Sequence, residues 1–204
     1  MKLTKITSDK NDEWIDRLSY YLEDPQDEFD HMEPTVGIDD YDYEPTNDFG
    51  NFVDNVKGAQ QEDIKHLPHV QVLYGAPGTG KSVWANALAH KLGFSFTNID
   101  MSNIKGKWVG DIRENFRRIV NTILNSQDVV FLIDEIDKQL GIENEGEQDE
   151  LSTHLQLGGQ LLEDLIDILD KYSERLVEYN IFIIITTNAD RTGTWRRFNT
   201  FHVE

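Results

Sequence analysis

The sequence predicts a three-layer α/β fold in which a parallel sheet of five strands lies between two layers of helices. From residue 70 onward, short apolar runs alternate with longer stretches of helical periodicity. This alternation is typical of parallel strands joined by crossover helices. A glycine-rich segment joins the first apolar run to the first helical stretch. A chain of 204 residues is also long enough to form a core without disulfides or a structural metal.

The elements follow one another in a regular order. The predicted strands are the apolar runs at 70–74, 94–99, 129–133, 181–186 and 199–203. The predicted helices cover 81–92, 110–125 and 151–172, where Leu155, Leu162, Leu165, Ile166 and Leu169 form one apolar stripe. The loop at 141–150 is acidic, and we expect it to be mobile.

The first fifty residues differ from the rest in charge. They hold 15 acidic and 4 basic residues, a net charge of −11, whereas residues 51–204 hold 23 and 15, a net charge of −8. We therefore expect an acidic N-terminal extension over 1–50 and a core over 51–204. A short amphipathic helix is predicted over 12–23, and no regular structure over 25–50. The second part is either a solvated, partly disordered leader or a segment that docks on a neighbouring subunit or partner.

Composition excludes several classes of protein. The total net charge of −19 disfavours a general nucleic-acid binder and an anionic membrane surface. No apolar stretch is long enough for a transmembrane helix. The sequence has no cysteine, which excludes disulfides and thiol nucleophiles and fits a reducing compartment, so we expect a cytoplasmic location.

The glycine-rich segment predicts a phosphate-binding loop. Residues 75–82, GAPGTGKS, match the pattern GxxxxGK[ST] between a strand and a helix, which is the context this motif requires. Glycines allow backbone N–H groups to surround phosphate oxygens, and the helix N-terminus adds partial positive charge. Lys81 would reach the terminal phosphates, and Ser82 would coordinate Mg²⁺. The expected nucleotide-binding residues are Gly75, Pro77, Gly78, Thr79, Gly80, Lys81, Ser82 and Val83.

A pair of carboxylates follows the third predicted strand. Asp134 and Glu135 come directly after 129–133, at the carboxyl end of the strand, where ligands bind in open α/β sheets. Successive residues of a strand point to different sides. Asp134 can therefore hold the Mg²⁺ shell while Glu135 faces the attacking water as a general base.

At this point the sequence resembles the AAA+ ATPase family over about residues 50–204. GAPGTGKS and FLIDEID resemble its Walker A and Walker B motifs, and Thr186-Thr187-Asn188 resembles the end of its sensor-1 strand. The resemblance implies ATP and Mg²⁺ as ligands, and it implies that Asn188 orients the attacking water. Arg196 and Arg197 resemble the arginine segment that reaches the nucleotide of the next subunit, which implies a ring, most often hexameric. Each arginine could instead be a surface cation.

Two further segments bear on the resemblance. Lys107, Trp108 and Val109 resemble the pore loop of family members that thread polypeptides, although Trp108 could simply pack against the following helix. Residues 52–58 weakly resemble the segment that packs against the base. The family usually continues into a helical lid, which we expect to be absent because the sequence stops at Glu204.

Four functions are compatible with these motifs. The leading hypothesis is a Mg²⁺-dependent ATPase subunit of a homo-oligomeric ring that remodels or threads a protein substrate. The second is a nucleotide-dependent assembly module with little turnover. A small-molecule kinase shares the phosphate-binding loop but needs no arginine from a neighbour. A motor acting on nucleic acid is the fourth, and Lys105 and Lys107 would make its channel locally basic.

Overall fold

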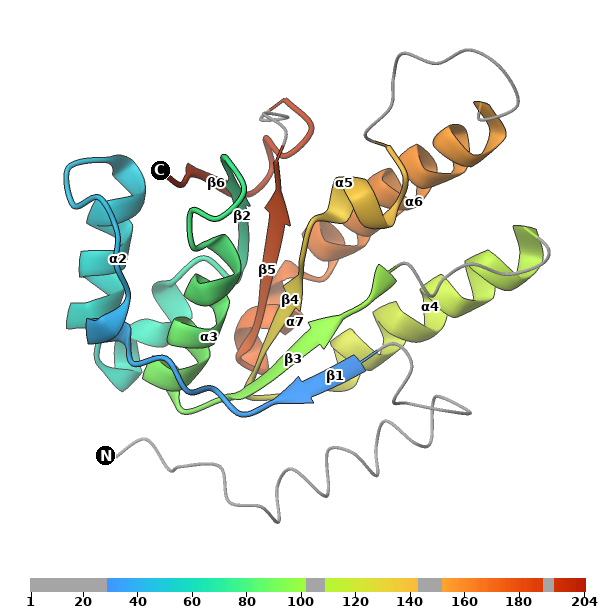
Figure 1. Ribbon diagram of the computed structural model, residues 1–204. Helices are drawn as coiled ribbons and strands as arrows, with labels where there is room; N and C mark the ends of the chain where they lie inside the picture. Colours follow the sequence, from blue (N-terminus) through green and yellow to red (C-terminus); the bar gives the residue numbers. More distant parts are fainter. Residues whose placement is uncertain (1–28, 102–108, 143–151, 189–192) are drawn as a thin grey trace.

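The computed structural model describes residues 29–101, 109–142, 152–188 and 193–204. Their strands form one six-stranded sheet in the order β1-β3-β4-β5-β2-β6 (Figure 1). Strands β2 to β6 are parallel to one another, and β1 pairs antiparallel with β3 at the edge. The strands are β1 (Phe29–Met32), β2 (Val70–Tyr74), β3 (Ser95–Ile99), β4 (Val129–Ile133), β5 (Ile181–Thr187) and β6 (Asn199–His202).

Helices cover both faces of the sheet and enclose two hydrophobic cores (Figure 1). Side chains alternate between the faces along β5: Ile183 lies in one core, and Phe182 and Ile184 lie in the other. The first core includes residues of α4 (Val109–Asn125), α5 (Ile136–Gln139), α6 (Ser152–Lys171) and α7 (Ser173–Glu178). The second includes residues of the 3₁₀ helices η1 (Ile38–Asp40) and η2 (Gln61–His66), and of α2 (Asp48–Gly58) and α3 (Lys81–Leu92).

The predicted three-layer fold is confirmed. All five predicted strands and the three predicted helices are present, with ends that differ from the expected ones by at most one residue. The sheet has one strand more than predicted, because β1 adds to its edge. Phe29 of β1 is buried and meets Phe131 edge-on, with 6.2 Å between the ring centroids. Four residues with one inward-facing aromatic give too short a pattern to indicate a strand.

The acidic segment from residue 29 to residue 50 differs from the expected solvated leader. Ile38, Tyr41 and Phe49 are buried in the second core, where Tyr41 and Phe49 both contact the Trp84 ring. The Asn86 side-chain oxygen accepts hydrogen bonds from two backbone N–H groups of this segment, at 2.9 and 2.8 Å. The described part of the segment is therefore packed on α3 of the same chain.

The expected division at residue 50 falls inside α2. This helix begins at Asp48, and the Asn47 side chain caps it by accepting a hydrogen bond from the N–H of Gly50 at 2.7 Å. The predicted helix over 12–23 lies outside the described residues. The sequence did not reveal the packing of 29–50 because its buried residues are irregularly spaced among prolines and carboxylates.

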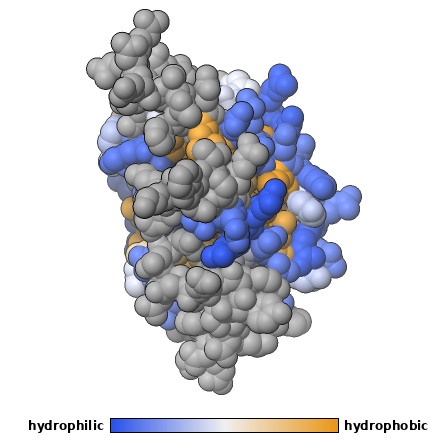
Figure 2. All heavy atoms as spheres, turned by 90° about the vertical axis from the view of Figure 1, so that its right-hand side faces the viewer, coloured by the Kyte–Doolittle hydropathy of each residue, from blue (hydrophilic) through white to orange (hydrophobic). Residues whose placement is uncertain are grey.

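Most of the described surface on the side of α4 and α6 is hydrophilic (Figure 2). On α6, Glu163, Asp164, Asp167 and Asp170 are exposed, whereas Leu162, Leu165 and Leu169 face the core. Within the described ranges, no helix has both the length and the apolar character needed to cross a membrane.

Candidate functional site

The glycine-rich loop leaves β2 and enters α3 through three glycines with positive φ. Gly75, Gly78 and Gly80 have φ values of +150°, +83° and +88°. These conformations are unfavourable for residues with a Cβ, so the backbone of this loop depends on glycine. The loop ends at the N-terminus of a twelve-residue helix, where unpaired N–H groups and the helix dipole favour an anion.

Lys81 is held against this loop in the structure. Its ammonium donates hydrogen bonds to the carbonyl oxygens of Gly75 and Ala76, at 2.9 and 2.8 Å. Burial lowers the pKa of Lys81, and the negative charges of Asp134 and Glu135 oppose this effect. A phosphate group at the loop would add further negative charge beside this buried cation.

The loop and the end of β4 meet at Asp134. The Ser82 hydroxyl donates to the Asp134 carboxylate at 2.6 Å, and the Thr186 hydroxyl of β5 donates to the same oxygen at 2.6 Å. Gln139 donates from its side chain to the main-chain oxygen of Asp134 at 2.6 Å. Asp134 is thus held from three different elements.

Glu135 has a left-handed backbone, with φ 47° and ψ 52°. Its carboxylate accepts hydrogen bonds from Lys138 at 3.2 Å and from the Asn188 side chain at 3.3 Å. These two hydrogen bonds lower the pKa of Glu135, so the carboxylate stays ionised over a wider pH range. The structure therefore places Lys81, Ser82, Asp134, Glu135 and Asn188 in one connected region, although they come from distant parts of the chain.

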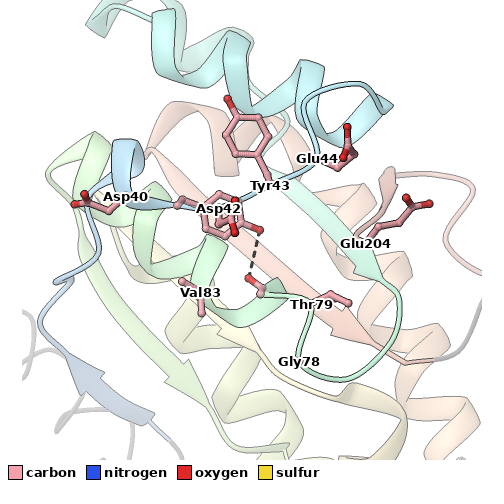
Figure 3. Close-up of a pocket in the computed structure, with 10 residues that line it drawn as sticks. Asp40, Asp42, Tyr43, Glu44, Gly78, Thr79, Val83 and Glu204 are labelled. Carbon is pink, nitrogen blue, oxygen red and sulfur yellow. Dashed lines mark hydrogen bonds between the residues drawn. The ribbon is translucent and has the colours of Figure 1, made fainter.

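A cavity of about 650 Å³ lies beside the loop. Gly78, Thr79 and Val83 form one side of it, and residues 40–44 form another (Figure 3). Its carboxylates are those of Asp40, Asp42, Glu44 and Glu204. Residues 52–58, which resemble the segment that packs against the base, are not among the residues that line this cavity, and Phe52, Val53 and Val56 are buried on the inner face of α2.

Tyr41 connects the N-terminal segment to the loop. Its hydroxyl donates to the main-chain oxygen of Gly80 at 3.4 Å, and its ring packs on Trp84 with 5.4 Å between the centroids. Burial raises the pKa of Tyr41, so its hydroxyl stays protonated and can serve as a donor. Sequence reasoning missed Tyr41 because its partner lies 39 residues away and no motif includes it.

The arginine segment lies on the surface. Arg196 and Arg197 are both exposed, between the buried Trp195 and β6. Arg197 forms an ion pair with Asp167 of α6 and lies 3.8 Å from the Asp170 carboxylate. Among the described residues, no hydrogen bond or ion pair joins either arginine to Lys81, Asp134 or Glu135 of the same chain.

The expected pore loop falls largely outside the described residues. Lys107 and Trp108 are not described, and Val109 is described only as the first residue of α4. The site also includes three residues that the sequence did not predict, namely Thr186, Lys138 and Gln139. Thr186 belongs to the segment Thr186-Thr187-Asn188, from which only a role for Asn188 was predicted. Lys138 and Gln139 follow the acidic pair without a recognisable pattern.

Solved structures and curated proteins resemble this chain. A structure described as the FIGL-1 AAA domain in complex with ADP superposes with a TM-score of 0.58 at 19% identity, covering 92% of this chain and 61% of that one. Cell division protein C of Sulfolobus acidocaldarius is 31% identical over 126 residues, which are 59% of this chain and 32% of that protein. A spastin homolog of Caenorhabditis elegans is 39% identical over 69 residues, 34% of this chain and 14% of that protein. The chain thus spans a third or less of these two relatives.

The family comparison covers more of the sequence. The family described as "ATPase family associated with various cellular activities (AAA)" matches residues 71–195. This range runs from β2 through the loop, the acidic pair and Asn188 to Trp195, so it contains the whole connected region around Asp134. The six-stranded sheet and the motif residues agree with the match, and the chain belongs to the AAA family of ATPases.

Proposed function

We propose that this chain binds ATP with Mg²⁺ and hydrolyses it as one subunit of an oligomeric ring that remodels or threads a protein. The observation that carries the proposal is the hydrogen-bonded array beside the phosphate-binding loop. The Ser82 hydroxyl there donates a hydrogen bond to the Asp134 carboxylate at 2.6 Å. The carboxylate of Glu135, the next residue, accepts a hydrogen bond from the Asn188 side chain. A hydroxyl, two carboxylates and an amide at the end of a parallel sheet supply the groups that phosphoryl transfer to water requires.

The loop and Lys81 would bind the phosphates. Backbone N–H groups of residues 78–82 would surround the oxygens, and the Lys81 ammonium would leave the two loop carbonyls to contact the terminal phosphates. Burial disfavours the charged form of Lys81 and the carboxylates of Asp134 and Glu135 offset this only in part, so the added negative charge of a bound phosphate would favour binding.

The cavity beside the loop would take the nucleoside. Its carboxylates at Asp40, Asp42, Glu44 and Glu204 repel phosphate but accept hydrogen bonds from amino and hydroxyl groups. The nucleotide is thereby oriented with its phosphates toward Lys81 and its base and ribose toward residues 40–44.

The side-chain oxygens of Ser82 and Asp134 are suitable ligands for Mg²⁺. Both are hard oxygen ligands, and they already lie within hydrogen-bonding distance of each other beside the loop. When bound, the metal would neutralise charge on the phosphate oxygens. Gly78, Thr79 and Gly80 contribute main-chain groups and would hold the phosphates in place.

Glu135 would act as the general base. Its carboxylate takes one proton from a water molecule while the water oxygen forms a bond to the γ-phosphorus, and the bond to the β–γ bridging oxygen breaks to give ADP and phosphate. Asn188, 3.3 Å from this carboxylate, would orient the water. Hydrogen bonds lower the pKa of Glu135, so its carboxylate is ionised at neutral pH and free of a proton, as a general base must be.

The arginine segment and the pore loop would act between subunits. Arg196 and Arg197 are exposed, and within the described ranges no hydrogen bond or ion pair joins them to Asp134 or Glu135. Both observations support a role at the nucleotide of a neighbouring copy, where a guanidinium stabilises charge on the transferred phosphoryl group. Residues 107–109 would contact the protein substrate in the centre of the ring. Particle imaging with and without ATP tests this assembly, and a chain that stays monomeric with ATP would contradict it.

The decisive experiment on hydrolysis is Glu135→Gln. We expect this variant to bind ATP like the wild type and to lose about 10²- to 10⁴-fold in turnover, because the general base is removed and the shape is kept. Glu174→Gln, an exposed position on α7, is the matched control. Phosphate release at saturating ATP and calorimetric ATP binding are measured in parallel. Hydrolysis by Glu135→Gln at the wild-type rate would contradict the role of Glu135.

One observation favours a second candidate, an assembly module that binds ATP with little turnover. Lys138 and Asn188 occupy both oxygens of the Glu135 carboxylate, and a base held in this way would have to release a partner before it could act. The same assay separates the two functions. Wild-type phosphate release no faster than in the absence of protein, together with ATP binding by calorimetry, would favour the assembly module.

A further inference from the structure

Thr186 joins the Asp134 carboxylate to the backbone of Glu135 through one buried hydroxyl. This residue of β5 is fully buried, with 0% of its surface exposed. Its hydroxyl donates to the Asp134 carboxylate at 2.6 Å and accepts a hydrogen bond from the backbone N–H of Glu135 at 2.8 Å. One side chain thereby fixes the side chain of the first acidic residue and the backbone of the second.

The backbone at Glu135 needs such support. A residue with a Cβ is disfavoured in the left-handed region, and Glu135 lies there, with φ 47°. Its N–H bonds to Thr186, and its main-chain oxygen accepts from the N–H groups of Lys138 and Gln139 at 2.9 and 3.0 Å. The left-handed turn ends β4, starts α5 and sets the direction in which the Glu135 carboxylate leaves the sheet.

The pairing of β5 with β4 brings this hydroxyl to its place. Ile185 lies opposite Ile133 in the parallel ladder, so Thr186 comes next to Asp134, the residue that follows Ile133. Thr187 points the other way and donates to the Asp137 carboxylate. The two adjacent threonines therefore serve different carboxylates, Thr186 that of Asp134 and Thr187 that of Asp137.

We propose that Thr186 is a positioning residue that aims Asp134 at the metal and Glu135 at the attacking water. This inference rests on the proposed function of the site and adds a residue to it. Without the Thr186 hydroxyl, the Asp134 carboxylate would keep only Ser82 as a side-chain hydrogen-bond donor within the described ranges, and the Glu135 N–H would lose its acceptor.

The test compares three variants. Thr186→Val keeps the shape and removes the hydroxyl, Thr186→Ser keeps the hydroxyl, and Thr122→Val is the control. Thr122 is also buried, but its hydroxyl has no hydrogen-bond partner in the described part of the chain. For each variant, kcat and KM for ATP are measured, and ADP binding is measured by calorimetry in Mg²⁺ and in EDTA.

We expect Thr186→Val to lose about ten- to hundred-fold in kcat, as when a hydrogen-bond partner of a metal ligand is removed. The gain in ADP affinity from Mg²⁺ should shrink, whereas the affinity in EDTA should stay unchanged because the phosphate-binding loop is intact. Thr186→Ser should retain both properties, and Thr122→Val should match the wild type.

Four results would overturn the proposal. One is a Thr186→Val variant that keeps the wild-type kcat and the wild-type gain in ADP affinity from Mg²⁺. Another is an equal loss of ADP affinity in Mg²⁺ and in EDTA, which would indicate a general structural defect. The third is a folded Thr186→Ser that loses the Mg²⁺ gain, and it decides the matter even if Thr186→Val does not fold. Should the wild type hydrolyse no ATP, the proposed hydrolysis fails, while the Mg²⁺ gain still tests Thr186. A wild type that binds no ADP overturns both.

Discussion

The first glycine of the phosphate-binding loop lies against the backbone that follows β6. A Cβ built on Gly75 would be 2.2 Å from the main-chain oxygen of Val203, and Gly75 has a φ of +150°. Gly78 has a similarly unfavourable φ of +83°, but a Cβ there would meet nothing within 4 Å. The two glycines therefore separate the cost of backbone strain from the cost of a steric clash.

Gly75→Ala should destabilise the protein more than Gly78→Ala. A Cβ in an unfavourable positive-φ conformation costs about 1–2 kcal/mol, which is the whole effect expected for Gly78→Ala. At Gly75 the new methyl group must also push the Val203 backbone away by more than 1 Å, and overpacking of this kind costs about a further 1–3 kcal/mol. The free energy of unfolding should therefore fall by about 2–5 kcal/mol in Gly75→Ala.

Urea unfolding followed by circular dichroism measures both variants, since a change of midpoint at constant slope reports stability alone. The experiment is done without nucleotide, because ligand binding would add its own stabilisation. If Gly75→Ala is no less stable than Gly78→Ala, the contact between the loop and Val203 does not constrain the loop, and the reasoning from the distance is refuted.

Two further changes test one contact of the site and one contact of the N-terminal segment. Lys138→Met should move the acidic limb of the ATPase pH profile to higher pH, because the loss of this hydrogen bond raises the pKa of Glu135 toward its ordinary value and the base is protonated sooner as pH falls. Lys138→Arg is the control, and an unchanged limb in Lys138→Met would show that the ion pair does not tune the base. Asn86→Ala should lower the free energy of unfolding by about 1–3 kcal/mol, since two backbone N–H groups lose their acceptor. It should also speed hydrogen exchange at those amides, and Asn121→Ala on the surface of α4 is the comparison that should leave exchange there unchanged.

The parts of the fold that the sequence predicted are those with strong local patterns. Strand β4 and residues 181–185 of β5 are unbroken runs of buried apolar residues, and 81–92 is a helix bounded by glycines on both sides. The parallel order of the sheet follows from the alternation of strands and helices. The carboxyl ends of these strands meet at one edge, so Ser82, Asp134 and Asn188 could be expected near one another.

The parts that the sequence did not predict depend on contacts between distant residues. Tyr41 reaches Gly80 across 39 residues, and Arg197 pairs with Asp167 across 30. Neither contact leaves a periodic signal. The left-handed backbone of Glu135 arises from hydrogen bonds to Thr186 and to the start of α5, which no local propensity encodes.

The place of β2 in the sheet has a consequence for how the protein acquires its activity. The strand that carries the phosphate-binding loop lies between β5 and β6, whose residues come more than 100 positions later in the chain. The hydrogen bond between the His69 ring and the main-chain oxygen of Ile181, for example, joins residues 112 positions apart. Contacts of this sequence separation are slow to form, because a long chain loop must close first. During synthesis, the loop therefore has no neighbouring strand until β5 has left the ribosome. Nucleotide binding should consequently be a late event in folding, and its appearance would report that the whole sheet has assembled.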